Sequence, residues 1–189
     1  MKLPQQFQIT LPDWCRTLAA ELPECLPEPE QRMALAIDLS RRNVEAGSGG
    51  PFGAVVAEVE SGRVLALGVN RVEPANCSSA HAEVVALSLA QAALAGWNLA
   101  DRGSIELATS CEPCAMCLGA IPWSGVQRVL CGATKEDAER TGFDEGTRDP
   151  DWIAALARRG IEVITGLQRE PAAAVLEDYR ARGARIYNP

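Results

Sequence analysis

Apolar residues recur along this chain in two patterns. Some segments repeat them every three to four positions, which predicts amphipathic helices, and others are short β-branched runs, which predict buried strands. We expect helices over about 30–46, 81–95, 113–121, 152–158 and 172–182. We expect strands over about 52–59, 64–69, 105–109, 128–132 and 161–165.

The order of these segments predicts an α/β fold. Only residues 60–63 separate the first two strands, so these strands are expected to pair as an antiparallel hairpin. The later strands alternate with helices, which favours parallel pairing between layers of helices. The polar stretch 70–79 is interpreted as a loop. A mixed sheet covered by helices follows from this arrangement.

The first 29 residues differ from the rest, because they are rich in proline and poor in periodicity. Asp13 is a candidate cap for a short helix that runs through Leu22. We expect residues 1–29 to form an N-terminal extension, either laid on the main domain or partly mobile. Residues 30–189 are expected to form that single main domain.

Composition limits the class of protein. With 47% hydrophobic residues in 189, the chain is expected to form one globular domain with a packed core. Neither a bilayer-spanning run nor a secretory signal is apparent, so we expect a cytoplasmic protein without a membrane partner. The net charge of −7 disfavours a nucleic-acid partner without excluding one.

Cysteine usage indicates chemistry rather than cross-linking. The chain has seven cysteines, and this odd number without a secretory signal argues against a disulfide framework. Three of them crowd together as Cys111, Cys114 and Cys117. In a reducing compartment, such a cluster is typical of a metal site or of redox chemistry.

A set of metal-binding residue types lies at two expected helix starts. His81 is the one histidine of the chain. Pro113 suits the first position of the later helix, which places Cys114 and Cys117 three apart on one helix face. One imidazole and two thiolates are a common tetrahedral zinc set whose fourth position is open to water. We therefore predict one zinc ion held by these three side chains.

Glu83 lies two residues after His81 and cannot easily ligate the same ion from the same turn. Zinc lowers the pKa of a bound water to about 7. Glu83 is expected to accept the proton of that water and to pass it to the substrate. The pattern H-x-E…P-C-x-x-C is that of zinc-dependent hydrolytic deaminases.

Other interpretations of these residues are open at this point. Glu83 could be a first-turn partner of the helix dipole. Cys111 and Cys114 form a competing C-x-x-C pair, and Cys111 could complete a closed structural zinc site. We prefer Cys114 with Cys117 because both belong to the same helix turn, and the turn at Pro113 is expected to aim Cys111 elsewhere.

At these residues the sequence resembles the cytidine deaminase-like superfamily, and more narrowly its small bacterial guanine deaminases. The resemblance covers roughly 30–145 and the last few residues. The matching strings are GPFGAVV at 50–56, GVN at 68–70, AHAEV at 80–84, TSCEPCAMCLGAI at 109–121 and GFDE at 142–145. The last string points to guanine deaminase, although Glu145 stands where aspartate is more familiar.

The resemblance implies a three-layer α/β/α fold with a five-stranded mixed sheet, and a homodimer with one zinc ion per subunit. It supports Cys114 and Cys117 as ligands and leaves Cys111 free. A C-terminal aromatic residue closes the site of the partner subunit in such enzymes, and Tyr187 is the matching residue here. Residues 30–189 would then be a deaminase domain with a closing C-terminal segment, which could be swapped between subunits.

The resemblance also implies substrate contacts. Phe52 and Trp123 would help to enclose the base, and Asn70 would hydrogen-bond its edge. Glu145 would contact the purine and assist proton transfer, and its neighbour Asp144 is a further candidate for a substrate contact.

The expected reaction is the hydrolysis of guanine to xanthine and ammonia, with amino-triazines such as ammeline as further candidate substrates. A tRNA adenosine deaminase shares the metal motif, but a basic docking surface would be expected there and this chain is acidic. The motif also fits cytidine and nucleotide deaminases. From a different class, the chain could be an inactive zinc-stabilised binding module, against which the intact Glu83 argues.

Overall fold

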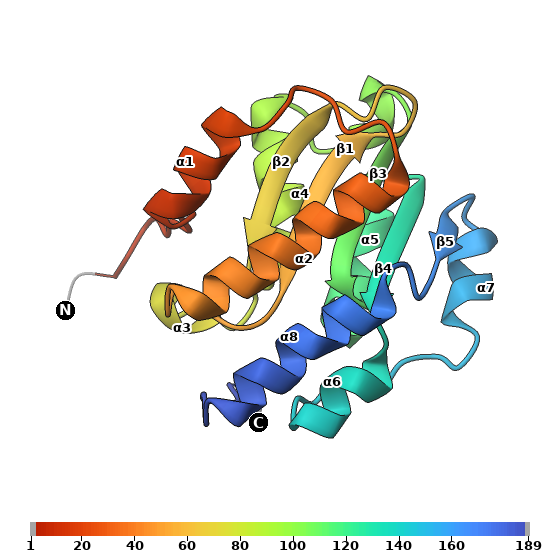
Figure 1. Cartoon of the computed structure of the whole chain (residues 1–189). Helices are drawn as coiled ribbons and strands as arrows, with labels where there is room; N and C mark the ends of the chain where they lie inside the picture. Colours follow the sequence, from red (N-terminus) through yellow and green to blue (C-terminus); the bar gives the residue numbers. More distant parts are fainter. Residues whose placement is uncertain (1–2, 188–189) are drawn as a thin grey trace.

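The computed structural model describes residues 3–187 and contains a five-stranded sheet (Figure 1). β1 pairs antiparallel with β2 and with β3, whereas β3, β4 and β5 are parallel. The expected hairpin and mixed sheet are therefore confirmed. In the spatial order β2-β1-β3-β4-β5, the strands are β2 (Val64–Val69), β1 (Gly53–Glu58), β3 (Ile105–Cys111), β4 (Arg128–Ala133) and β5 (Glu162–Ile164).

Helices cover both faces of the sheet, which gives the expected three layers (Figure 1). One layer contains α2 (Pro29–Glu45), α6 (Lys135–Thr141) and α8 (Arg169–Ala181). The other contains α4 (Ala82–Ala93), α5 (Ala115–Ser124) and α7 (Trp152–Ala157). The remaining helical segments are α1 (Asp13–Glu21), α3 (Val72–Ala75) and the 3-10 helix η1 (Leu99–Arg102). Within residues 3–187, no helix has the length and apolar character needed to span a bilayer.

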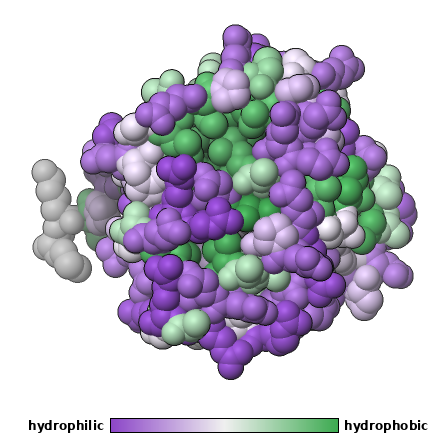
Figure 2. Space-filling model, viewed as in Figure 1, coloured by the Kyte–Doolittle hydropathy of each residue, from purple (hydrophilic) through white to green (hydrophobic). Residues whose placement is uncertain are grey.

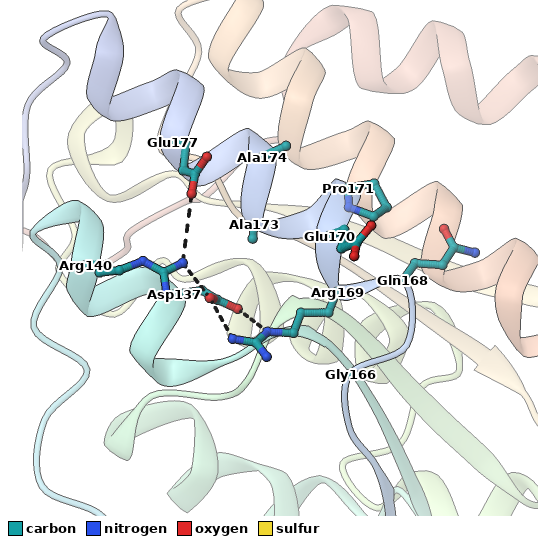
Figure 3. A pocket seen from close by; sticks show the side chains of 10 residues that line it. All are labelled: Asp137, Arg140, Gly166, Gln168, Arg169, Glu170, Pro171, Ala173, Ala174 and Glu177. Atoms are coloured by element: carbon teal, nitrogen blue, oxygen red, sulfur yellow. Dashed lines mark hydrogen bonds and ion pairs between the residues drawn. The ribbon is translucent and has the colours of Figure 1, made fainter.

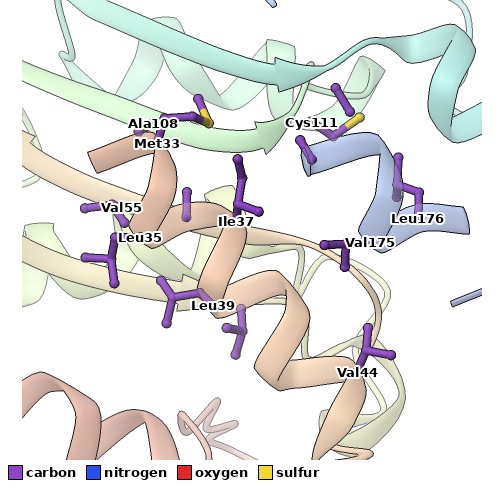
Figure 4. Close-up of a cluster of buried hydrophobic side chains, with 14 of the residues drawn as sticks. Met33, Leu35, Ile37, Leu39, Val44, Val55, Ala108, Cys111, Val175 and Leu176 are labelled. Atoms are coloured by element: carbon purple, nitrogen blue, oxygen red, sulfur yellow. The ribbon is translucent and has the colours of Figure 1, made fainter. Parts of the chain in front are cut away.

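Alternation along the strands divides the core into two clusters. Val55 belongs to the cluster beneath α2, together with Met33 and Ile37 (Figure 4). The next residue, Val56, belongs to the opposite cluster with Leu87 of α4. Successive strand residues point to opposite faces, and both faces are covered, so the central strands carry buried apolar residues on both sides.

Helix α1 of the extension lies against the main domain, on the side of β2 (Figure 1). Cys15 is fully buried, and Trp14 and Leu18 pack against the cluster beneath α2. A cavity of about 400 Å³ remains between α1 and β2, with apolar lining residues such as Leu65 and Leu89. Apolar surface is visible in this hollow in Figure 2.

Two α-helices and the 3-10 helix η1 were not expected from the sequence. The predicted loop 70–79 contains the single-turn helix α3, and α6 follows β4 directly. Helix α6 has a capping box, in which the Thr134 hydroxyl accepts from the backbone of Asp137 and the Asp137 carboxylate accepts from the backbone of Thr134. Both helices are too short to display a helical hydrophobic period, so periodicity could not reveal them.

Several predicted helix starts are wrong by one to three residues. Asp13 lies inside the first turn of α1, and the cap position is Pro12. Pro113 precedes α5 instead of starting it, so Cys114 becomes its N-cap.

Helix α5 also continues through Pro122 to Ser124, beyond the predicted end at about 121. A proline inside a helix removes one backbone donor. Here that loss does not end the helix.

Candidate metal and active site

The three predicted metal ligands lie at two helix N-termini that meet at one place. His81 is the N-cap of α4 and Cys114 is the N-cap of α5, with Cys117 in the first turn of α5. The positive ends of both helix dipoles favour the thiolate form of the cysteines. Residues far apart in the sequence are brought together because both helices pack on the same face of the sheet.

The spacing of the donor atoms fits a zinc ion. His81 Nδ1 lies 3.5 Å from Cys114 Sγ and 3.6 Å from Cys117 Sγ. Zn–S bonds of about 2.3 Å and Zn–N bonds of about 2.0 Å in a tetrahedron place such atoms about 3.5 Å apart. Among residues 3–187, no further histidine, cysteine or carboxylate lies close enough to be a fourth protein ligand of this group. The donor set therefore leaves one coordination position to water or substrate.

One of the cysteines is readily ionised. The Cys117 thiol donates a hydrogen bond to Cys114 and, together with His81, lowers the pKa of Cys114 to about 4 although burial opposes this. A thiolate is therefore available at neutral pH, as zinc ligation requires.

Cys111 is directed away from this group. It is the last residue of β3, and its thiol lies 3.5 Å from the backbone oxygen of Thr134. Burial raises the pKa of Cys111 well above its usual value. This placement favours Cys114 with Cys117 over the competing pair, and it removes Cys111 as a fourth ligand of a closed site.

Three carboxylates line a small cavity beside the metal ligands. The cavity has a volume of about 10 Å³, which is room for about one water molecule. Its walls are formed by Phe52, His81, Glu83, Glu112, Cys114 and Glu145. Burial raises the pKa of Glu83 to about 7 and that of Glu145 to about 8. A bound dication would oppose these shifts, because it favours the ionised carboxylates.

Glu112 lines the cavity and was missed by the sequence interpretation, although it stands just before Pro113. Its carboxylate is paired with Arg148 and accepts a hydrogen bond of 3.2 Å from the backbone of Lys135. The Arg148 guanidinium also lies 4.9 Å from the ring centre of Trp152. The one sign of its role in the sequence was the position of this charged residue directly beside the metal motif.

The loop that carries Glu145 is held in place by hydrogen bonds to its backbone oxygens. The N–H of Ala115, in the first turn of α5, donates to the Glu145 oxygen at 2.9 Å. The Lys135 ammonium donates to the Gly146 oxygen at 2.8 Å. The loop is thus fixed to the same helix start that carries the cysteines.

Asn70 has an unused donor beside this site. It is 1% exposed, and its Oδ1 accepts from the backbone of Gly50 at 3.4 Å and of Val72 at 3.2 Å. Its backbone N–H donates to the oxygen of Phe52, which lines the cavity. Within the described part of the chain, Asn70 Nδ2 is buried without a hydrogen-bond partner. A buried amide donor without a partner is costly, so Asn70 Nδ2 is free to bind a ligand.

Three aromatic side chains pack against one another beside the cavity. Phe143 contacts Phe52 edge-on, with ring centres 5.0 Å apart, and Tyr187 at 5.3 Å. Tyr187 lies so close to Gly50 that a β-carbon there would be 2.3 Å from the tyrosine hydroxyl. The tyrosine hydroxyl is itself buried without a partner among residues 3–187. Tyr187 therefore covers this region from within its own chain.

Two residues expected at the site lie outside the cavity. Trp123 is 80% exposed and lines a separate hollow of about 380 Å³ beside Trp152. Asp144 is exposed, and its Oδ1 accepts from the backbone N–H of Gly146 at 2.8 Å. Neither side chain lines the cavity that contains Glu83 within this single chain.

A cavity of about 640 Å³ lies elsewhere, between α6 and α8 (Figure 3). The arginines that line it, Arg140 and Arg169, are both paired with Asp137. Among the residues that the structure describes, no histidine or cysteine lines this cavity, and the Asp137 carboxylate is already bound by the two arginines, so the cavity lacks the chemistry of the Glu83 site.

Comparisons with known proteins agree with the donor set. The family model described as the cytidine and deoxycytidylate deaminase zinc-binding region matches residues 27–133. The guanine deaminase of Bacillus subtilis is 46% identical over 110 residues, which are 58% of this chain and 67% of that protein.

Solved structures extend the similarity to almost the whole chain. The guanine deaminase of Nitrosomonas europaea has 46% identity and a TM-score of 0.89, over 96% of this chain and 100% of that one. The protein NE0047 in complex with 2,6-diaminopurine has 48% identity and a TM-score of 0.89, over 96% of both chains. The chain therefore belongs to the cytidine and deoxycytidylate deaminase family of zinc-dependent hydrolytic enzymes.

Proposed function

We propose that this enzyme hydrolyses guanine to xanthine and ammonia. The observation that carries the proposal is the meeting of the His81, Cys114 and Cys117 donors with two buried carboxylates, Glu83 and Glu145, around one cavity. The similarity to the guanine deaminases of Bacillus subtilis and Nitrosomonas europaea supports guanine as the base.

Recognition of the base is assigned to Asn70 and Phe52. The free Nδ2 donor of Asn70 suits the O6 and N7 acceptors on the edge of guanine. The ring of Phe52 at the cavity wall offers an apolar face to the flat base. A base without an acceptor on that edge would leave the Asn70 amide unpaired, which gives a physical basis for selectivity.

Catalysis is assigned to the two carboxylates. When bound, zinc supplies the nucleophile by lowering the pKa of a water molecule toward neutrality. Glu83 accepts one proton of the attacking water as the water oxygen bonds to the ring carbon that bears the exocyclic amine, and it delivers this proton to the adjacent ring nitrogen. It then accepts the remaining proton of the added hydroxyl and passes it to the amine, so that the carbonyl of xanthine forms, the carbon–nitrogen bond breaks and ammonia leaves. Glu145 acts as a second acid/base or as an anchor for that amine. Burial raises the pKa of both carboxyl groups, and repulsion from the Cys114 thiolate adds to the rise. A bound zinc ion opposes this rise and favours the carboxylate form of Glu83, which accepts the first proton.

Entry of the base requires an opening of the site. The cavity of about 10 Å³ is far below the roughly 300 Å³ or more of common small-ligand pockets. The segment 184–187 lies outside any helix or strand and ends in Tyr187. We infer that this segment moves aside for the base and then returns.

We also infer that the enzyme works as a homodimer. Met116 and Trp123 of α5 are exposed by 39% and 80%, and large exposed apolar side chains favour a partner surface. If a second subunit binds this surface, Trp123 can approach the active site of that subunit. Light scattering of the purified protein measures the mass, and a monomer at micromolar concentration would contradict this inference.

The test of the activity is an ammonia-release screen on zinc-loaded protein. Guanine, adenine, cytosine, their nucleosides and ammeline form the substrate panel, and guanine is expected to give the highest kcat/KM. Glu83→Gln should lose activity by at least about 100-fold and retain zinc. Glu60→Gln, in the exposed hairpin turn, is the matched control and should remain active. Full zinc content without ammonia from any base would instead indicate a binding module.

A further inference from the structure

The N-terminal helix α1 is connected to Asn70 by a continuous set of hydrogen bonds. Trp14 Nε1–H of α1 donates to the Ser48 hydroxyl at 3.0 Å. That hydroxyl donates to Asn43 Oδ1 at 2.7 Å. Asn43 Nδ2 then donates to the backbone oxygens of Gly50 and Asn70, each at 2.9 Å.

The loop between α2 and β1 fits tightly where these bonds converge. A β-carbon at Gly49 would lie 2.0 Å from the backbone oxygen of Asn70. Asn43 is fully buried, and each atom of its amide group has a partner. Arg71 adds a further hydrogen bond to the backbone oxygen of Ser48. The loop has little freedom once Ser48 is fixed, because buried polar groups that lose a partner are costly.

The same loop determines the orientation of the Asn70 amide. The Gly50 N–H donates to Asn70 Oδ1, so the position of Gly50 helps to decide which amide atom remains free. With Oδ1 occupied by Gly50 and Val72, only Nδ2 is left for a ligand.

We propose that the N-terminal extension is a positioning element for substrate binding, which acts from Trp14 through Ser48 and Asn43 on Asn70. Trp14 does not touch the base. It holds the loop that presents the Asn70 donor and the glycine on which Tyr187 rests. The proposal rests on the proposed function, because the orientation of Asn70 affects binding only if this residue contacts the base.

The test compares Trp14→Phe with Trp97→Phe. The first variant keeps an aromatic ring against the core and removes the donor to Ser48, whereas Trp97 is 78% exposed and serves as the matched control. We expect the KM for guanine to rise about 2- to 10-fold in Trp14→Phe, as loss of one hydrogen bond implies, while kcat and zinc content remain nearly unchanged. Ser48→Ala should produce a similar rise, and the double variant should add little to it, because both changes break the same connection.

Hydrogen exchange of the backbone around 47–52 provides a readout without substrate. Faster exchange in Trp14→Phe than in Trp97→Phe, together with the higher KM, is the expected result. Unchanged exchange, or faster exchange with an unchanged KM, would overturn the role of the extension while leaving the guanine activity intact. Wild-type protein without guanine deamination would overturn the proposed function first, and the inference with it.

Discussion

The buried charge cluster at Glu106 allows a sharp test of the fold. Glu106 of β3 is fully buried and binds two guanidinium groups, those of Arg32 in α2 and Arg128 in β4. Arg32 also donates to the backbone oxygen of Pro27 at 2.8 Å, at the junction with the extension. The perturbation is Glu106→Gln, which removes the negative charge and keeps the shape of the side chain.

The expected loss of unfolding free energy follows from the burial of the two arginines. The Arg32 side chain is 1% exposed and would remain as a buried cation without a counter-charge, whereas Arg128 is 17% exposed and can reach water. Breaking a buried pair by removing one partner costs about 3–5 kcal/mol. Because the glutamine oxygen still accepts one hydrogen bond, we expect the lower end, about 3 kcal/mol. For a chain of this length, that value corresponds to a Tm lowered by about 6–12 °C.

Urea unfolding followed by circular dichroism is the assay, with Asp38→Asn as control. Asp38 pairs with Arg42 one helical turn away, at 2.7 Å on the exposed face of α2. Such a pair contributes only about 0.3–0.5 kcal/mol. A Glu106→Gln protein no less stable than Asp38→Asn would refute the assignment of a buried, uncompensated Arg32 charge.

Three further predictions concern the loop, the metal and acid stability. Arg148→Ala should lower kcat at least about 10-fold with zinc retained, because Arg148 anchors the loop of Glu145 to Glu112. Arg158→Ala, on the exposed end of α7, is the control and should leave kcat unchanged. Steady-state kinetics and metal analysis of both variants measure the difference. Chelation of zinc should abolish ammonia release and lower the Tm, and zinc should restore both, so a metal-free protein with full activity would contradict the ligand assignment. Hydrogen bonding from Arg169 lowers the pKa of Asp137, so its stabilisation is present above the unfolded pKa of about 4 and is lost as the pH falls toward its folded pKa. Asp137→Asn should therefore destabilise the protein at pH 7 and much less at pH 2, as measured by urea unfolding; an equal loss at both values would contradict the ionic origin.

Local patterns were sufficient for much of the fold. Helix α2 and the hairpin β1–β2 follow from periodicity and from the short connection between the strands, both of which depend on neighbouring residues. Helix α6 was missed because seven residues are too few to display a period, although the capping pair Thr134 and Asp137 was readable in the sequence.

The chemistry of the metal site was also encoded locally. His81, Cys114 and Cys117 are recognisable because zinc requires these residue types, and because donors three apart in a helix start share one face. The sequence leaves open whether Cys111 or Cys117 joins Cys114 at the metal. The tertiary structure decides between them, because the end of β3 directs Cys111 toward Thr134.

The surroundings of the site depend on contacts that no local pattern encodes. Glu112 and Arg148 lie 36 residues apart, and Trp14 and Ser48 lie 34 apart. A hydrogen bond between distant residues leaves no period or motif in the sequence, since neither partner is marked by its spacing or by its neighbours. Residue type and spacing therefore determine which chemistry the chain can perform. The packing of α1, α5 and the Glu145 loop decides which side chains hold that chemistry in place, because only the folded chain brings their donors and acceptors within bonding distance.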